Sequence, residues 1–402
     1  MAIRIKVAKT QQEIDDALWV RHEVFVVQDG KFGGKPFPDE RVIDRFDAFP
    51  HVWNLIAYDG VEPIATIRLT RENQLGLPAE KYYDFSEYRQ AAARELESKG
   101  RSNGESTPAP IFGSAGMLAV REGWRRRRDV IRAMYKVAAG VCASSDVTHI
   151  VAAVNFRTVN MYRRLGFSPL TDKLWMDEIG EYVVPLAATA EEFCDWAFSD
   201  LPNTPLTAFK DGFERLFLNP GERIFSEGDE GRDAYIIQSG NVRITRGRKE
   251  RKEFMLAHML NGDLFGELAL IDEKPRSATA VAITDAELIT LDRETFNREV
   301  SANPVQMRQL LKIFTERLRG MDDLVMKLAF SPKKERLEFA LALARLRTIP
   351  DRGNEGQQLY NGGPSDLASS AAVDETTVRR FLDKESEKGE LTYSHKSIRF
   401  LR

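Results

Sequence analysis

Cysteine and histidine are both scarce in this chain of 402 residues, which contains two cysteines, Cys142 and Cys194, and five histidines. A disulfide framework and a cysteine-based zinc cluster are therefore excluded, and with so few histidines we expect no metal site. Long apolar runs are also absent, because stretches such as residues 150–154 fall far short of the roughly 20 residues that span a bilayer. The N-terminal segment has no apolar signal core, so the sequence predicts a cytoplasmic protein without a membrane span.

No charge of one sign dominates the composition. The 58 basic and 61 acidic residues leave a net charge of −3, so any affinity for nucleic acid or membrane must come from a local patch. At roughly 100–200 residues per domain, the length predicts a modular protein. The proline-containing stretch 199–206 is typical of a linker, whereas the break at residues 349–356 is typical of a loop within a domain. We expect domains at residues 1–200, 206–330 and 331–402.

The N-terminal segment mixes helical and strand patterns and predicts an α/β domain. Asp59-Gly60 between two apolar runs is typical of a β-hairpin. Gly166 follows a short helical pattern, at the position where a helix C-cap favours glycine. The other expected elements are a helix over residues 11–26, strands over 53–59, 64–70, 116–120 and 149–154, and a long helix over 128–144.

An arginine-rich turn separates the strand at 116–120 from the long helix, and the run 155–167 follows the next strand. This order resembles the GNAT acyltransferase superfamily. In that family the strand–loop–helix junction binds the acyl donor's phosphates or its phosphopantetheine arm, and a helix N-terminus favours anions. The alternative is that the arginines form a solvated face. The resemblance implies donor binding by Leu118, Val120, Arg125, Arg126, Arg127, Arg128 and Asn155, with arginines in place of the family's usual glycines.

Tyr162 lies in the helical pattern after that strand, where the superfamily places a tyrosine that donates a proton to the leaving thiolate. A phenol beside a departing sulfur is a suitable general acid, because the proton transfer is short. The alternative is an ordinary half-buried aromatic whose hydroxyl finds any partner.

The front of the chain carries a second set of motifs, Arg21-His-Glu-Val-Phe25, Asp44-Arg-Phe-Asp47 and Ile67-Arg68-Leu69. They resemble the acyl-homoserine-lactone synthases and the related N-acyl amino acid synthases. The resemblance implies that Arg21, Phe25 and Arg68 bind substrate, with the arginines holding an acceptor carboxylate. It also implies that Asp44 and Asp47 attract the acceptor ammonium and help to remove its proton. The alternative is a structural ion-pair network.

The sequence departs from the lactone synthases before the strand at 116–120. Ser114 and Met117 stand where that family carries a Glu and an Arg. We therefore expect N-acylation of an amino acid or another amine rather than lactone production. The arginine run also offers a basic landing site for an acidic acyl carrier protein.

Residues 215–296 change to short alternating strands separated by glycine turns, which predicts a small β-barrel or jelly roll. The run Phe265-Gly-Glu-Leu-Ala-Leu followed by Pro275-Arg-Ser-Ala closely resembles the phosphate-binding cassette of cyclic-nucleotide-binding domains. The resemblance implies that Arg276 pairs with the cyclic phosphate and that Glu267 accepts from the ribose hydroxyl. The other implied nucleotide-binding residues are Gly266, Leu268, Ala269, Ser277 and Ala278.

The helix after the barrel has apolar residues at alternating steps of three and four from Leu311 to Leu328. This heptad seam predicts a parallel homodimer, with packing onto the chain's own barrel as the alternative. Met321 and Asp322 align with the purine-contacting residues of the catabolite activator protein but differ from its hydroxyl pair. We expect cAMP rather than cGMP as the effector.

Residues 331–402 resemble the winged helix-turn-helix of the same bacterial regulators. Their predicted recognition helix begins with Asp374, Glu375 and Thr376, and only Arg380 matches the base-reading set. This segment has 13 Lys and Arg against 11 Asp and Glu, a net charge of +2, which is a thin positive field for a nucleic-acid backbone. DNA binding is therefore not favoured.

The leading hypothesis from the sequence is a cyclic-nucleotide-regulated N-acyltransferase. It would move an acyl chain, of the long type used by the acyl carrier protein-dependent relatives, from acyl carrier protein or acyl-CoA to an amine such as an amino acid. One alternative is a nucleotide-responsive transcription regulator whose GNAT module only senses acyl groups. Another is a protein lysine acyltransferase that uses acyl-CoA.

Overall fold

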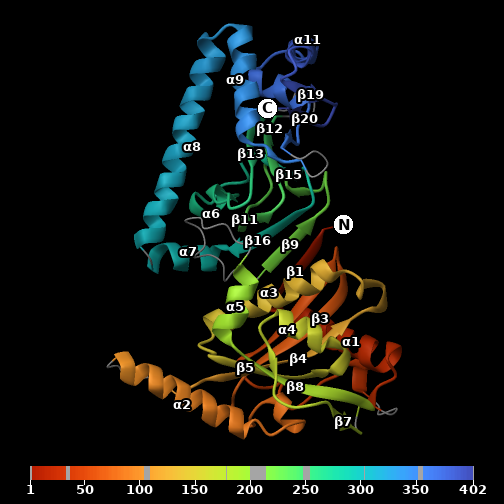
Figure 1. The fold of residues 1–402 in the computed structure, drawn as a ribbon. Helices are drawn as coiled ribbons and strands as arrows, with labels where there is room; N and C mark the ends of the chain where they lie inside the picture. The colour runs from red at the N-terminus through yellow and green to blue at the C-terminus, as the bar shows by residue number, and fades with distance from the viewer. Residues whose placement is uncertain are drawn as a thin grey trace. The chain divides into compact units, whose positions relative to one another are not determined.

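The computed structural model describes residues 2–32, 37–103, 109–177, 179–199, 214–247, 254–302, 304–351 and 356–401 (Figure 1). These residues form two compact units, one over residues 2–199 and 214–216 and the other over residues 217–401. Most of the predicted linker at 199–206 lies outside the described residues. In the described part of the chain, no helix has the length and apolar character needed to cross a membrane.

The first unit is built on a mixed β-sheet whose strands follow the order β1-β2-β3-β4-β5-β8-β6, with β7 paired to β8. Every neighbouring pair is antiparallel except β4–β5, which is parallel. The strands are β1 (Ile3–Val7), β2 (Val52–Asp59), β3 (Glu62–Arg71), β4 (Phe112–Val120), β5 (His149–Asn155), β6 (Ser168–Pro169), β7 (Leu174–Met176) and β8 (Glu181–Thr189).

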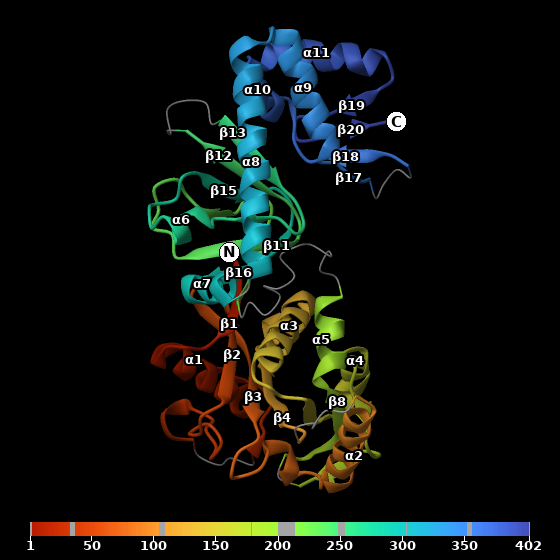
Figure 2. The ribbon, with the colours of Figure 1, turned by 90° about the vertical axis from the view of Figure 1, so that its left-hand side faces the viewer.

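Helices cover both faces of this sheet. Figure 2 shows α1 on one side of β1–β3 and α3 with α5 on the other, and β3 is accordingly buried without interruption from Ile64 to Thr70. The helices are α1 (Gln11–His22), α2 (Ser86–Asn103), α3 (Arg128–Ser144), α4 (Val159–Arg164) and α5 (Ala190–Phe198), with a π-helical turn η1 (Glu23–Gln28) and short 3-10 turns η3 (Pro38–Glu40), η4 (Pro78–Lys81), η5 (Glu122–Trp124) and η6 (Phe156–Thr158).

Local sequence explains several of these boundaries. Thr10 and Glu13 form a capping box that starts α1. Gly60, with φ +62°, makes the turn of the β2–β3 hairpin that Asp59-Gly60 predicted. The predicted helix over 128–144 is α3, and the predicted helix over 11–26 is α1 followed by the π-helical turn.

The second unit begins with a two-sheet β-barrel. In one sheet β14, β11, β16 and β9 are neighbours in that order, and in the other β10, β15, β12 and β13. This is the jelly-roll type of barrel that the glycine turns predicted. Its elements are β9 (Glu214–Leu218), β10 (Arg223–Phe225), β11 (Asp233–Ser239), β12 (Val242–Arg246), β13 (Phe254–Met259), β14 (Leu264–Phe265), α6 (Leu268–Ile271), β15 (Thr279–Ala282) and β16 (Ala286–Asp292).

Helices α7 (Arg293–Ala302) and α8 (Pro304–Phe330) follow the barrel and lead to a small C-terminal α/β part. Its elements are α9 (Lys333–Leu346), β17 (Ile349–Pro350), β18 (Gln358–Tyr360), α10 (Pro364–Ala371), α11 (Glu375–Glu387), β19 (Leu391–Tyr393) and β20 (Ile398–Phe400). Within the second unit this part contacts the barrel: Nη1 of Arg243 lies 2.7 Å from Oδ1 of Asp366 at the start of α10. The His258 ring of β13 packs edge-on against Tyr360, with 5.3 Å between the ring centroids.

Candidate functional sites

Strands β4 and β5 separate soon after they begin. They pair from Phe112 to Ser114, and no pairing between them is present farther along β4. Beyond this point β4 carries a bulge: Met117 and Leu118 lie between the positions paired with Arg68 and Thr66. Met117 has φ +54°, a left-handed conformation that a non-glycine residue adopts only when its surroundings impose it. The sheet thus opens into a split whose edge is a kinked strand.

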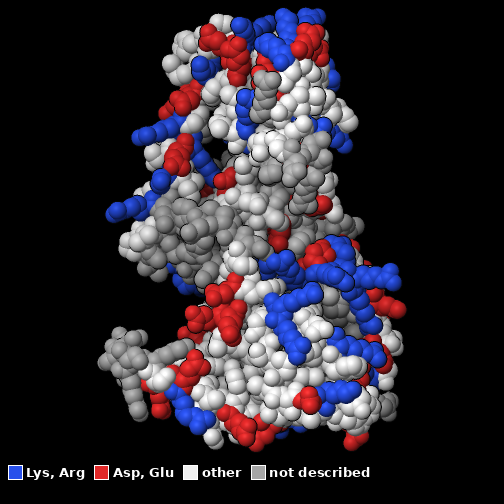
Figure 3. All heavy atoms as spheres, in the orientation of Figure 1, with Lys and Arg blue, Asp and Glu red and all other residues white. Residues whose placement is uncertain are grey.

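The arginine run lies in the turn before α3, at the start of the helix that follows β4. Arg125 donates to Oδ1 of Asp29 at 2.8 Å, and Arg127 forms a 2.7 Å ion pair with Asp129 in the first helical turn. Arg126 and Arg128 are exposed and have no ion pair or hydrogen bond from their side chains within the described residues. Figure 3 shows Lys and Arg side chains gathered on this face of the first unit. Two of the four predicted guanidinium groups are therefore available to an anion.

Tyr162 on α4 is fully buried, and its hydroxyl oxygen accepts a hydrogen bond of 2.7 Å from the hydroxyl of Tyr135 on α3. Burial raises the pKa of Tyr162 to about 12, although the hydrogen bond from Tyr135 opposes this increase. Since α3 follows β4 and α4 follows β5, this contact joins the two sides of the split.

The predicted substrate residues Arg21, Asp44, Asp47 and Arg68 form one ion-pair cluster. Arg68 holds both oxygens of Asp44, at 2.7 and 2.8 Å, and also lies 3.0 Å from Asp47. Arg21 contacts both oxygens of Asp47, at 3.0 and 3.1 Å, and donates to Asn54. Burial alone would raise the pKa of Asp47, but the charges of Arg21 and Arg68 hold it below its ordinary value. The network expected as the alternative is therefore present.

Only one side chain of this cluster is accessible. The Asp44 side chain is 33% exposed, whereas those of Arg21, Asp47 and Arg68 are 0%, 7% and 2% exposed. Asp44 is thus the carboxylate that an incoming ammonium can reach, and the two guanidinium groups are already engaged with carboxylates.

The remaining predicted residues of the first unit lie around the split. Phe25 packs against the small apolar cluster that contains Ala119 of β4. Val120 is buried and Leu118 is half-buried at the end of the same strand. Asn155 ends β5, and its side-chain oxygen accepts from the backbone N–H of Arg157 at 2.9 Å.

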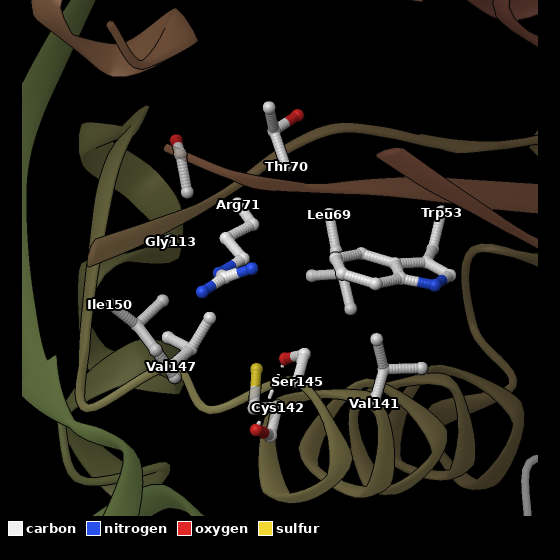
Figure 4. A pocket seen from close by; sticks show the side chains of 11 residues that line it. Trp53, Leu69, Thr70, Arg71, Gly113, Val141, Cys142, Ser145, Val147 and Ile150 are labelled. Carbon is white, nitrogen blue, oxygen red and sulfur yellow. Dashed lines mark hydrogen bonds between the residues drawn. The ribbon is translucent and has the colours of Figure 1, made fainter. Parts of the chain in front are cut away.

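A pocket lies at the closed end of the split, between the sheet and the C-terminal end of α3 (Figure 4). The space between its lining atoms, counted together with open solvent at its mouth, is about 240 Å³. Arg71 extends from β3 into it and has no side-chain partner in the described part of the chain. The lining is otherwise mainly apolar or small: Trp53, Leu69, Thr70, Gly113, Ser114, Val141, Cys142, Ser145, Val147 and Ile150.

The predicted nucleotide cassette forms a compact cradle in the barrel, and Glu267 and Arg276 are both buried in it. Nη1 of Arg276 donates to the carbonyl oxygen of Gly266 at 2.7 Å, and its guanidinium lies 4.2 Å from the ring centroid of Phe225. Gly266 has φ +77°, and a Cβ there would lie 2.8 Å from Nη1 of Arg276, so a side chain would displace the guanidinium. Ala269 and Ala278 are buried, whereas Leu268 and Ser277 are exposed.

The chemistry of this cradle fits a cyclic phosphate. Nε of Arg276 is buried and has no partner among the described residues, so the guanidinium keeps a donor for an anion. Burial lowers the pKa of Arg276, and burial raises the pKa of Glu267. A bound phosphate would supply a negative charge to pair with the buried guanidinium.

Arg317 on α8 is a site residue that the sequence reasoning missed. Its Nη1 donates to Oε1 of Glu267 at 2.5 Å, and its Nη2 donates to the carbonyl oxygen of Leu264. Its position offered a clue. Arg317 lies four residues before Met321, which aligns with a purine-contacting residue, and residues four apart share a helix face. The long helix therefore contacts the nucleotide cradle through this guanidinium.

Two stretches of the chain match known protein families. Residues 16–189 match the family described as N-acyl amino acid synthase FeeM, and residues 215–303 match the cyclic nucleotide-binding domain. The cyclic AMP receptor protein of Thermus thermophilus is 34% identical over 178 residues, which cover 44% of this chain and 79% of that protein. The chain belongs to the cyclic AMP receptor protein family, with an N-acyl amino acid synthase domain of the FeeM family in front. The fusion predicted from the motifs is thus confirmed.

The chain is similar to two further proteins. The CRP-like cAMP-activated global transcriptional regulator of Mycobacterium tuberculosis is 28% identical over 44% of this chain and 80% of its own. The solved structure of FeeM, an N-acyl amino acid synthase from uncultured soil microbes, covers 48% of this chain and 94% of that one, at 13% identity and a TM-score of 0.35.

Helix α8 of the second unit leaves most of its predicted heptad seam exposed. Leu311, Leu318, Met321 and Val325 are between 56% and 61% exposed, and Phe314 is half-buried. The alternative to a dimer was packing of this helix face onto the chain's own barrel. The barrel does not cover these four exposed residues.

Helices α10 and α11, in the C-terminal part of the second unit, form a helix-turn-helix and are joined through Ala372 and Val373. Asp374 caps α11 by accepting from the backbone N–H of Thr377 at 2.8 Å, and Glu375 pairs with Arg379 at 2.6 Å. The start of α11 is therefore acidic, and Arg379 is engaged within its own helix.

Proposed function

We propose that the protein is a cytoplasmic N-acyltransferase of the GNAT type, which transfers an acyl chain from acyl carrier protein or acyl-CoA to an amine such as an amino acid. A bound cyclic nucleotide would set its activity. The observation that carries the proposal is the split between β4 and β5, with the Met117 bulge on its edge, inside the range that matches the N-acyl amino acid synthases. The proposed domains are residues 1–200, 206–330 and 331–402.

The thioester lies in the split in this proposal. Backbone N–H groups at the bulge polarise its carbonyl, and this donation strengthens as charge develops on the oxygen. Asp44, which is partly exposed and also pairs with Arg68, attracts the acceptor ammonium and takes its proton before attack. Arg21 and Arg68 act by holding Asp47 and Asp44 in place, because both guanidinium groups are already paired.

The donor's phosphates bind at the turn before α3. Arg126 and Arg128 are the free guanidinium groups there, and they suit either a phosphate or the acidic face of a carrier protein. The acyl chain runs toward the pocket at the closed end of the split, whose lining is mainly apolar or small.

Cyclic nucleotide, cAMP in preference to cGMP, binds the barrel through Arg276 and Glu267. The relatives named for cyclic AMP support this choice. The ribose hydroxyl approaches the carboxylate that Arg317 holds, so ligand binding changes the environment of α8. An effector alters activity only through different affinity for two arrangements of the protein, and the contact between Glu267 and Arg317 is the element that nucleotide binding would bias.

One product assay tests the transferase. The full chain is incubated with acyl carrier protein or CoA thioesters, with free amino acids or a lysine peptide, and with or without cAMP or cGMP. Mass analysis should reveal N-acyl amino acids whose yield changes with cAMP. Acylated lysine peptide alone would instead favour the protein lysine acyltransferase, and no acylated product would refute the enzyme.

Nucleotide binding has its own test. cAMP should raise the unfolding temperature of the native protein and of Arg232→Ala, whose side chain is exposed on the barrel surface. It should leave that of Arg276→Ala unchanged. Equal shifts in all three proteins would refute the proposed cradle.

The second candidate function is a nucleotide-responsive transcription regulator. The helix-turn-helix of α10 and α11 and the similarity to the cAMP-activated transcriptional regulator of Mycobacterium tuberculosis favour it. The acidic start of α11 argues against tight binding to a phosphate backbone. Sequence-selective, salt-dependent binding to duplex DNA would support this candidate.

A further inference from the structure

Tyr135 and Tyr162, two buried phenols of the first unit, share a hydrogen bond. Both rings are buried, at 2% and 4% exposure, and they meet edge-on with centroids 5.5 Å apart. Because both phenol hydroxyls are buried, each has few other hydrogen-bond partners within reach.

The direction of the bond matters for catalysis. Tyr135 is the donor and the Tyr162 oxygen is the acceptor, at 2.7 Å. Within the described residues the Tyr162 hydroxyl has no other hydrogen bond, so its own hydrogen remains available. A phenol that receives a hydrogen bond at its oxygen is better able to give up its proton, because the bond stabilises the phenolate that forms.

We propose that Tyr135 is a positioning residue for acyl transfer, which fixes the Tyr162 hydroxyl at the split and stabilises its phenolate while the thiolate leaves. This inference rests on the proposed transferase function. The pKa directions agree: burial raises the pKa of Tyr162 to about 12, and the hydrogen bond from Tyr135 lowers it.

The step balances in protons and electrons. The acceptor ammonium first loses one proton to the Asp44 carboxylate, and the free amine then forms the C–N bond. As the C–S bond breaks, the electron pair leaves with sulfur, which takes the Tyr162 proton. The new amide nitrogen gives its second proton to solvent, and the Tyr162 phenolate regains a proton from solvent. The net products are the amide, the free thiol and one proton released by way of Asp44.

Leaving-group dependence tests the role. The full chain carrying Tyr135→Phe, Tyr162→Phe or both is assayed with an alkyl thioester and with an aryl thioester of the same acyl chain, whose thiolate leaves without a proton. With the alkyl donor we expect kcat to fall about tenfold in Tyr135→Phe and further in Tyr162→Phe, and the double variant to match Tyr162→Phe. With the aryl donor all three variants should stay within about twofold of the native protein.

Tyr58→Phe is the matched control. It removes another phenol hydrogen bond of the same unit, from Tyr58 to Asp16 at 2.8 Å, and should leave both donors unaffected. Equal losses of Tyr135→Phe with both donors, or no loss with the alkyl donor, would overturn the inference while leaving the transferase intact. A native protein that transfers no acyl chain would instead overturn the proposed function and the inference with it.

Discussion

The carboxylate of Glu267 in the nucleotide cradle accepts a hydrogen bond of 2.5 Å from Arg317 on α8. Glu267 is almost fully buried, so this bond supplies the positive charge that its side chain needs. It also ties the residue proposed to bind the ribose to a long helix with an exposed apolar seam. In the proposed function, a nucleotide bound in the cradle would therefore act on α8 through this ion pair.

Arg317→Ala should separate nucleotide binding from nucleotide response. Binding should persist because Arg276 is untouched, but the effect of cAMP on acyl transfer should be lost. The free energy of unfolding should fall by about 1–3 kcal/mol, because a buried carboxylate loses its partner. Calorimetric titration and the transfer assay measure these effects, with the exposed Arg319→Ala on the same helix as control. A full cAMP response in Arg317→Ala would contradict the prediction.

Asp44→Asn and Asp47→Asn should fail in different ways. Asp44 is the accessible carboxylate, so its replacement should lower kcat about a hundredfold. The replacement should cost less stability than that of Asp47, because Arg68 keeps its ion pair with Asp47. Asp47 neutralises two buried arginines, so its replacement should cost about 3 kcal/mol of unfolding free energy. Steady-state kinetics and urea unfolding separate the two. Similar destabilisation of both variants without a specific loss of kcat would mean that the cluster is only structural.

The seam of α8 should hold two copies of the chain together. Leu318→Glu and Val325→Glu place a charge in the middle of an exposed apolar row and should convert the dimer to a monomer. Sedimentation analysis at several protein concentrations, with and without cAMP, measures this. Arg319→Glu changes charge outside the seam and should leave the dimer intact. A native chain that stays monomeric throughout would disprove the assignment.

His258 should make the second unit less stable in mild acid. Burial first, and then the charges of Arg347 and Arg243, lower its pKa from 6.5 to about 3. The unfolded chain therefore takes up a proton below pH 6.5 that the folded chain refuses, so stability present above pH 6.5 is lost as the pH falls toward 3. The loss should reach about 2 kcal/mol at pH 5.

His258→Phe keeps an aromatic ring against Tyr360 and removes the titration. Urea unfolding between pH 5 and 7.5 should then show a weaker pH dependence for the variant than for the native protein. Parallel curves for the two proteins would show that other groups cause the acid sensitivity.

Sequence patterns predicted the elements that depend on local chemistry. Asp59-Gly60 indicated its hairpin, and the spacing from Gly266 to Arg276 indicated a cradle whose two charged residues do lie together. The matches over residues 16–189 and 215–303 confirmed the resemblances to the N-acyl amino acid synthases and to cyclic-nucleotide-binding domains.

Long-range geometry was beyond the same patterns. Tyr135 and Tyr162 are far apart in sequence, so no periodicity signals that their hydroxyls meet. The Met117 bulge depends on how β4 pairs with β3 rather than on its own residues. The motifs named Arg21 and Arg68 as binders of an acceptor carboxylate, and only three-dimensional packing reveals that protein carboxylates already occupy them.

The separation of β4 from β5 leaves main-chain amides of both strands facing a gap inside the sheet. Main-chain amides pair with any extended chain that itself carries amides, whatever side chains surround them. Substitutions along the rim of this gap should therefore be tolerated more readily than proline, which removes the N–H on which such pairing depends. In the proposed transferase the backbone would do part of the donor recognition, so arginines in place of the glycines expected from the resemblance are compatible with donor binding.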